Sequence, residues 1–156
     1  MNDLSDLLGP DAVASGLSVR GKKALFQHLA AMAGDRIGVD PADIAARLAA
    51  REKLGSTGFG GGIAIPHARI DGVERVRGLF VRLAAPVDFQ AVDGLPVDLI
   101  FVLLSPRESG ADHLKALARV SRRLRDRPLT EKLRGAGSTD AIYALLSGFG
   151  ARDAAA

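Results

Sequence analysis

The segment PVDLIFVLLSP at residues 96–106 restricts the fold more than any other part of the chain. Its apolar stretch from Val97 to Leu104 suits a β-strand and is far too short for a membrane-spanning helix, which needs about 20 apolar residues. Because nearly every position is apolar, the strand is expected to be buried on both faces of a central sheet. Such a sheet needs a covering layer on each side, so we expect an α/β layered domain.

Amphipathic helices are predicted on both sides of this strand. The first follows Ser18, which is placed to cap it, and the second begins at Asp40-Pro41 and ends at Gly55. A third helix is predicted over residues 112–124. The apolar positions expected to face the core are Leu25, Leu29 and Met32 in the first helix, Ile44, Leu48 and Leu54 in the second, and Leu114, Leu117, Val120 and Leu124 in the third.

Two further strands and two short helices complete the expected pattern. The strands are predicted at residues 63–66 and 78–84, and the helices at 129–135 and 139–149. Helices before, between and after strands favour one layered α/β domain. The strand order, and whether the sheet is parallel or mixed, do not follow from these patterns.

Composition and charge exclude several classes of protein. Without cysteine the chain forms no disulfide, thiolate zinc site or cysteine nucleophile. The acidic N-terminus is not a signal peptide, so a cytoplasmic protein without membrane insertion is expected. The net charge is only +3, and beyond the cluster at residues 119–127 the basic residues are scattered, so no nucleic-acid partner is expected. One domain is expected over residues 1–150, with a disordered tail at 151–156.

The densest chemical signal is the run from Arg51 to His67, REKLGSTGFGGGIAIPH. A Gly-rich loop allows backbone N–H groups to converge on an anion, and Arg51 offers a permanent cation suited to phosphate oxygens. Pro66 is expected to fix the exit of a short strand and to present His67 at its end. The loop is no P-loop, since it lacks the Lys, and no dinucleotide fingerprint, since it follows a helix and opens a strand. An anion site beside an imidazole suits phosphoryl or acyl transfer.

The other two histidines differ in their surroundings. His28 lies inside the first predicted helix and is expected to be a partly exposed bystander. His113 falls in the first turn of the helix after the buried strand, where the helix N-terminus should keep it neutral. Asp71 and Asp112 form no recognised metal spacing with His67 and His113, so no metal site and no cofactor are expected.

The run REKLGSTGFGGGIAIPHARI at residues 51–70 closely resembles the active-site segment of the fructose/mannitol-type enzyme IIA domains of the bacterial phosphotransferase system. The stretches PVDLIFVLLSP and HLKALARVSRRL follow in the family's order and spacing, so the resemblance covers most of the chain. Within the family the sequence is most similar to the nitrogen-regulatory branch, EIIA-Ntr. It departs from that branch at Gly61 and at Ala68-Arg69, where no catalytic group is involved.

This resemblance implies a mixed, roughly five-stranded sheet sandwiched between helices. It implies that His67 is the phosphoryl acceptor, with phosphorylation on the tele nitrogen, and that His113 and Arg51 complete the active site. The residues it places at the phosphate are Thr57, Gly58 and Gly60.

The partners implied by the resemblance are an HPr-type phosphohistidine carrier, charged from phosphoenolpyruvate by enzyme I, and a receiver. Two roles stay open. In the first, the protein is a phosphocarrier of nitrogen and metabolic regulation, and the receiver is a regulatory target protein. In the alternative, it is a sugar-transport IIA component that passes the phosphoryl group to a IIB domain of the fructose/mannitol class.

Overall fold

The computed structural model describes residues 4–148, and β6 (Val97–Pro106) is the central strand of its sheet. Strand β5 (Arg77–Val87) runs antiparallel to β6 on one side. Strands β3 (Ile63–Ala64) and β4 (His67–Ile70) both run parallel to β6 on the other side. All of β6 except Asp98 and Pro106 is buried, which confirms a central strand covered on both faces.

The sheet is mixed and five strand positions wide. Strands β3 and β4 lie one after the other along the same edge of β6, with Ile63 opposite Leu99 and His67 opposite Leu103. Strand β1 (Val13–Leu17) pairs in parallel with β5, and β2 (Gly58–Gly60) pairs antiparallel with β3. The six strands within residues 4–148 therefore follow the order β1-β5-β6-β3-β2, with β4 continuing the line of β3.

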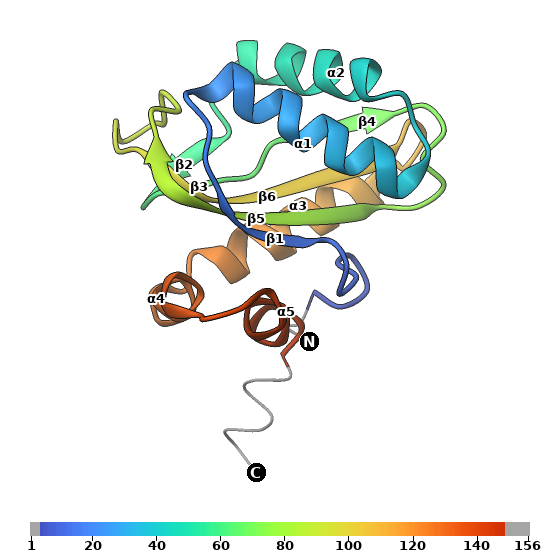
Figure 1. Cartoon of the computed structure of the whole chain (residues 1–156). Coiled ribbons are helices and arrows are strands. Elements are labelled where there is room, and N and C mark those ends of the chain that lie inside the picture. The colour runs from blue at the N-terminus through green and yellow to red at the C-terminus, as the bar shows by residue number, and fades with distance from the viewer. Residues whose placement is uncertain (1–3, 149–156) are drawn as a thin grey trace.

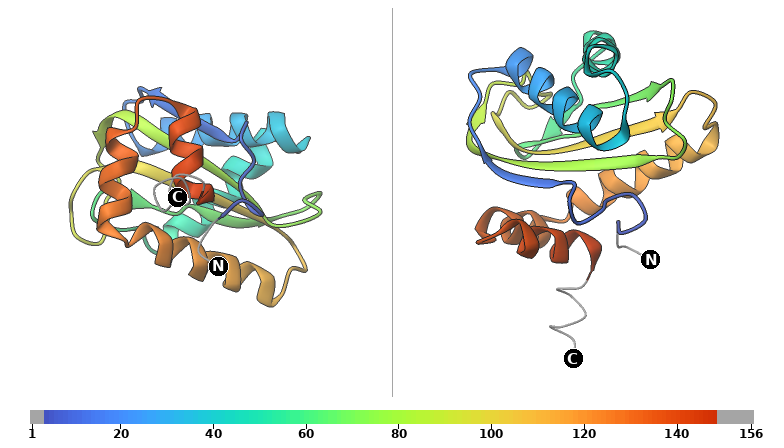
Figure 2. Two further views of the ribbon diagram at one scale, coloured as in Figure 1. Left: turned by 90° about the horizontal axis from the view of Figure 1, so that it is seen from below. Right: turned by 45° about the vertical axis from the view of Figure 1, so that its right-hand side comes forward.

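Helices cover both faces of this sheet (Figure 1). Helices α1 (Lys22–Ile37) and α2 (Pro41–Lys53) lie side by side on one face. Helices α3 (Ala111–Leu124), α4 (Arg127–Gly135) and α5 (Thr139–Ser147) cross the other face, as the view from below in Figure 2 shows. The sandwich expected from the resemblance is therefore present. The predicted tail at residues 151–156 lies outside the described residues.

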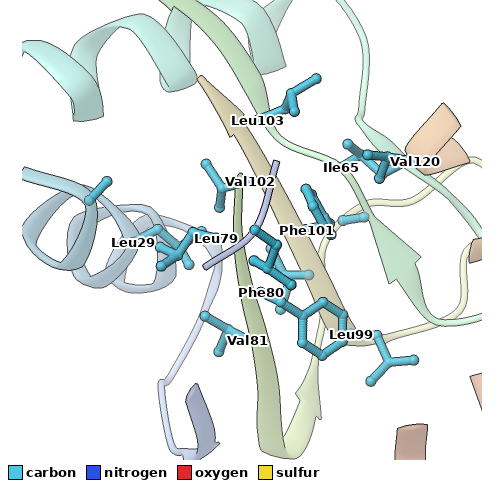
Figure 3. Packing of buried hydrophobic residues seen from close by; sticks show 14 of the residues in the cluster. Leu29, Ile65, Leu79, Phe80, Val81, Leu99, Phe101, Val102, Leu103 and Val120 are labelled. Carbon is cyan, nitrogen blue, oxygen red and sulfur yellow. The ribbon is translucent and has the colours of Figure 1, made fainter. Parts of the chain in front are cut away.

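Aromatic and branched side chains of β5 and β6 fill the centre of the molecule (Figure 3). Phe80 and Phe101 stand opposite each other on the two strands, with ring centroids 6.4 Å apart in an edge-on arrangement. Both rings are completely buried. This rigid pair of strands fixes the end of β6 from which the chain turns toward α3.

The predicted start of the second helix is correct, and that of the first is wrong. Asp40 caps α2 by accepting a hydrogen bond from the Ala42 N–H at 3.0 Å, and Pro41 is the first helical residue. Ser18 caps nothing, because α1 begins four residues later at Lys22, with Gly21 as an N-cap that makes no side-chain bond. The cause is β1, which the sequence did not predict: the chain must first leave the sheet edge before a helix can form.

Two of the apolar positions assigned to the core are exposed. Leu54 is 84% exposed, because α2 ends at Lys53 and Leu54 lies beyond the buried stripe. Leu114 is 62% exposed, because α3 buries the neighbouring stripe, which starts one residue earlier. The buried residues of α3 are His113, Ala116, Val120 and Leu124. The other predicted core positions are buried or half-buried against the core.

The segment between α2 and β4 also differs from the prediction. Part of the expected Gly-rich loop forms the short strand β2. His67 does not end the strand that contains Ile63; it begins the separate strand β4. Pro66 causes the break, because it has no N–H for the ladder, while its carbonyl still accepts a bond from the Leu103 N–H at 2.9 Å.

Candidate active site

Three side chains singled out in the sequence meet at one place, and each comes from a different element. Arg51 stands in the last turn of α2, His67 is the first residue of β4, and His113 lies in the first turn of α3. The Nε–H of Arg51 donates to Nε2 of His67 at 3.2 Å. The two imidazole rings have centroids 5.6 Å apart and planes inclined by 49°.

The hydrogen bonds of His67 determine where its lone pair lies. Its Nδ1 is 2.8 Å from the carbonyl oxygen of Ile65. A carbonyl oxygen only accepts, so Nδ1 must carry the hydrogen and donate it. In the neutral ring, Nε2 then holds the lone pair, which agrees with its acceptance of the Arg51 N–H. Nε2 is therefore the nucleophilic atom of this imidazole.

A second contact holds the guanidinium of Arg51 against His67. Its Nη1 donates to the carbonyl oxygen of Gly55 at 2.9 Å, in the turn that directly follows α2. Because a guanidinium has five N–H donors in a planar fork, these two bonds leave further donors for an anion. Helix end and turn thus fix a permanent positive charge beside the nucleophilic nitrogen.

A buried hydroxyl group holds the ring of His113. Its Nδ1 lies 2.6 Å from Oγ of Ser105, near the end of β6. Ser105 is completely buried, and His113 is 5% exposed because it begins the inward stripe of α3. This bond ties the end of the central strand to the start of α3.

Both imidazoles are neutral near pH 7. Burial lowers the pKa of His67, and the charges of Arg51 and Arg69 lower it further, while the hydrogen bond to Ile65 and the carboxylate of Glu52 oppose them. Burial likewise lowers the pKa of His113 to about 4, with a contribution from Arg69. The sequence predicted a neutral His113 and gave the field of the helix N-terminus as the cause. In the structure, burial is the main cause.

The three residues line a hollow in the surface with a cationic wall and an apolar rim. Arg47 and Arg69 join Arg51 in that wall. The rim carries the exposed side chains of Leu54 and Leu114, the two residues that the sequence had wrongly assigned to the core. No carboxylate belongs to the lining within the described residues. The hollow is suited to an anion carried by a macromolecule with an apolar surface.

The structure does not bring Thr57, Gly58 and Gly60 into this hollow. The Thr57 hydroxyl donates to the carboxylate of Glu52 at 2.6 Å, and the Gly58 N–H donates to Oγ of Ser56 at 3.1 Å. At Gly60, φ is 118°, and an added Cβ would lie 3.1 Å from the carboxylate of Asp93. Their phosphate contacts therefore stay predictions, and in the unphosphorylated protein these groups order the loop.

Glu52 is the organising residue of that loop, and no pattern in the sequence predicts this role. Its carboxylate accepts both the N–H and the hydroxyl of Thr57 and pairs with Nζ of Lys22 at 2.7 Å. Burial raises its pKa, but the bonds from Lys22 and Thr57 outweigh burial and lower the pKa overall. In the sequence Glu52 stands within the run REK at a helix end, which is typical of a solvated surface.

Several of the remaining candidate groups form ion pairs. Asp71 pairs with Arg107 at 3.0 Å, and residues 4–148 contain no group of three His, Asp or Glu side chains placed to hold a metal ion. In the basic cluster, Arg119 pairs with Asp6 and Arg123 with Asp126. His28 is exposed on α1, as predicted. Within the same residues, no helix has the length and hydropathy to cross a membrane.

The chain is similar to known proteins in sequence and in fold. Residues 6–148 match the family described as "Phosphoenolpyruvate-dependent sugar phosphotransferase system, EIIA 2". The "Nitrogen regulatory protein" of Bradyrhizobium diazoefficiens is 46% identical over 144 residues, which cover 92% of this chain and 94% of that protein. The protein of the same name from Escherichia coli is 35% identical over 145 residues, covering 92% of this chain and 89% of its own.

A solved structure agrees with these sequence matches. The crystal structure of "Nitrogen Regulatory Protein IIA-Ntr" from Neisseria meningitidis superimposes with a TM-score of 0.86 at 37% identity. The match covers 91% of this chain and 97% of that one. The match in sequence covers 92% of this chain and the match in fold covers 91% of it.

Proposed function

The chain belongs to the EIIA 2 family of the phosphoenolpyruvate-dependent sugar phosphotransferase system, and from this membership we propose that it is a phosphocarrier that accepts a phosphoryl group on His67. The donor is an HPr-type phosphohistidine carrier charged in the cytoplasm from phosphoenolpyruvate. The main role is nitrogen and metabolic regulation. One observation carries the proposal: His67 presents the lone pair of a neutral imidazole on Nε2, in contact with the cation of Arg51.

The transfer step follows from the tautomer of His67. The Arg51 N–H first releases Nε2, whose lone pair then attacks the phosphorus of the carrier's phosphohistidine. A new N–P bond forms as the donor's N–P bond breaks. The electron pair of the broken bond remains on the carrier's imidazole nitrogen. When the other ring nitrogen of the donor phosphohistidine carries a hydrogen, the carrier leaves as a neutral imidazole and no proton has to move. The Nδ1 hydrogen stays on His67 in its bond to Ile65, so the phosphorylated ring carries a positive charge. A neutral imidazole needs no separate base near pH 7.

The groups around His67 stabilise the charge of the transferring phosphoryl. In a loose transition state that charge lies on the equatorial oxygens. Arg51 contacts the acceptor nitrogen and the His113 ring lies 5.6 Å from that of His67, so both can donate to those oxygens, and Arg69 adds positive charge to the same hollow. Donors of this kind, fixed before the reaction, are the main source of stabilisation in such transfers.

The surroundings of the hollow support docking of a protein on either side of the transfer. Leu54 and Leu114 offer exposed apolar area at its rim, and exposed apolar groups beside a charged site are typical of an interaction surface. The nitrogen regulatory proteins of B. diazoefficiens and E. coli each match 92% of this chain. These relatives favour a regulatory target as receiver over the alternative, a IIB domain of a fructose/mannitol transporter.

Intact mass spectrometry tests the proposal. The protein is incubated with phosphoenolpyruvate, enzyme I and the HPr-type carrier, and is compared with His67→Ala and with His28→Ala as the matched control. We expect an acid-labile gain of one phosphoryl group in the wild type and in His28→Ala, and none in His67→Ala. If the carrier is charged and the wild type gains nothing, the phosphocarrier function is wrong. If His67→Ala still gains the group, the acceptor residue is wrong.

A further inference from the structure

We propose that Ser105 is a positioning residue that fixes His113 in the tautomer with its hydrogen on Nε2, so that His113 acts as a hydrogen-bond donor toward the phosphoryl group. This inference rests on the proposed function for its catalytic consequence. The tautomer itself follows from the structure of the unphosphorylated protein.

The hydrogen of the buried Ser105 hydroxyl needs an acceptor. Within residues 4–148, His113 Nδ1 is the one group that bonds to this Oγ, at 2.6 Å, and Ser105 is completely buried. If Nδ1–H donated to Oγ, the hydroxyl hydrogen would be buried without an acceptor, which is costly. If the hydroxyl donates to Nδ1, every buried polar group of the pair is satisfied. The second arrangement is therefore the stable one.

The tautomer at Nε2 follows directly. A neutral imidazole has one N–H, and Nδ1 accepts from Ser105, so the hydrogen of His113 must be on Nε2. His113 is neutral near pH 7, and within the described residues its Nε2 bonds to no other group of the protein. The ring lines the same hollow as His67. An N–H directed there can donate to an oxygen of the bound phosphoryl.

The two histidines thus hold opposite tautomers. In His67 the hydrogen is on Nδ1, fixed by the Ile65 carbonyl, and the lone pair on Nε2 is the nucleophile. In His113 the hydrogen is on Nε2, fixed by the Ser105 hydroxyl. One ring is prepared to attack the phosphorus and the other to bind its oxygens. A second lone pair facing the phosphoryl oxygens would repel them, so the tautomer of His113 decides whether it helps or hinders transfer.

Long-range proton–nitrogen NMR of the histidine rings at pH 7 measures the tautomer directly. The wild type is compared with Ser105→Ala, with Ser105→Thr, which restores a hydroxyl, and with the matched control Ser147→Ala. Ser147 is also buried, but its hydroxyl donates to the Ala144 carbonyl within α5. We expect protonated Nε2 in the wild type, the threonine variant and the control, and a mixture of tautomers in Ser105→Ala.

The rate of phosphoryl transfer from the charged carrier is measured on the same variants. We expect Ser105→Ala to be slower by the reciprocal of the fraction of His113 that keeps its hydrogen on Nε2, roughly twofold for an equal mixture, with threonine restoring the rate. Protonated Nδ1 in the wild type, or an unchanged tautomer and rate in Ser105→Ala, would overturn the inference. If the wild type is not phosphorylated at all, the proposed function fails, and the NMR result still decides the role of Ser105.

Discussion

Removal of the Glu52 carboxylate should destabilise the protein more than any other single change at an acidic residue of α2. The side chain is 8% exposed and its ion-pair partner Lys22 is 21% exposed. Breaking a buried pair from one side costs about 3–5 kcal/mol. Lys22 keeps some contact with water and lies over the Phe89 ring at 4.7 Å, so we place Glu52→Ala at about 3 kcal/mol, near the lower limit.

The isosteric variant Glu52→Gln separates the contribution of the charge from that of the acceptor oxygens. Glu52→Gln keeps one acceptor oxygen for Thr57 and loses the charge that Lys22 and the Thr57 donors share. We therefore expect it to cost about half as much, roughly 1–2 kcal/mol. The matched control is Glu131→Ala on the exposed face of α4, which should change stability by less than about 0.5 kcal/mol.

Urea denaturation at pH 7 gives the free energies of unfolding of the three variants and of the wild type. The melting temperature of Glu52→Ala should lie about 6–12 °C below that of the wild type. The pH dependence adds an independent check. Because the folded protein lowers the pKa of Glu52 below its ordinary 4.5, its stabilisation is complete above that value and is lost as the pH falls through the folded pKa. The gap between wild type and Glu52→Gln should therefore close in acid. A loss for Glu52→Ala no larger than that of Glu131→Ala, or a gap that persists in acid, would refute the reasoning.

Two further predictions concern the site. Arg51→Ala should slow phosphoryl transfer roughly 100-fold, because it removes a fixed donor to the transition state, and His113→Ala should slow it roughly 10-fold while the protein still folds. Quenched-flow measurement of transfer from the charged carrier gives both rates. The control Lys53→Ala, in the same helical turn as Arg51, should transfer at the wild-type rate. His113 should stay neutral on acidification until about pH 4, so the unfolded chain binds a proton below its ordinary pKa of 6.5 that the folded protein does not. The free energy of unfolding should therefore fall between about pH 6.5 and 4, and a titration of the His113 ring by NMR that centres near 6.5 would contradict this.

Much of the fold follows from local patterns in the sequence. The run from Val97 to Leu104 is apolar on both faces, and the structure buries it at the centre of the sheet. The Asp40-Pro41 start of α2 also follows from the sequence, because a cap acts within two or three residues of itself. The strand β1 does not, since Val13–Leu17 includes Ser and Gly and forms a strand only through its pairing with β5. Its edge position is a property of the whole sheet.

The residues of the site show the same difference between what local sequence predicts and what only tertiary contacts determine. Arg51, His67 and His113 were predicted because the residue types and the family resemblance mark them, and the structure brings them together. Glu52 and Ser105 were missed, because each acts on a residue through a contact that no spacing rule predicts. Ser105 is an ordinary residue at the end of a strand until α3 places the His113 ring 2.6 Å from it.

Phosphorylation of His67 changes the net charge of the hollow and therefore its attraction for a partner protein. Arg47, Arg51 and Arg69 give it three positive charges, and the two neutral imidazoles add none. A phosphoryl group brings about two negative charges, and the ring that keeps its Nδ1 hydrogen gains one positive charge, so the net charge of the hollow falls from +3 to roughly +2. A partner that docks on the apolar rim with acidic groups over the arginines would lose part of its electrostatic attraction when His67 is phosphorylated. We therefore expect a partner with acidic groups over the arginines to bind the unphosphorylated protein more tightly than the phosphorylated one, whereas the donor brings its own phosphoryl charge to the arginines.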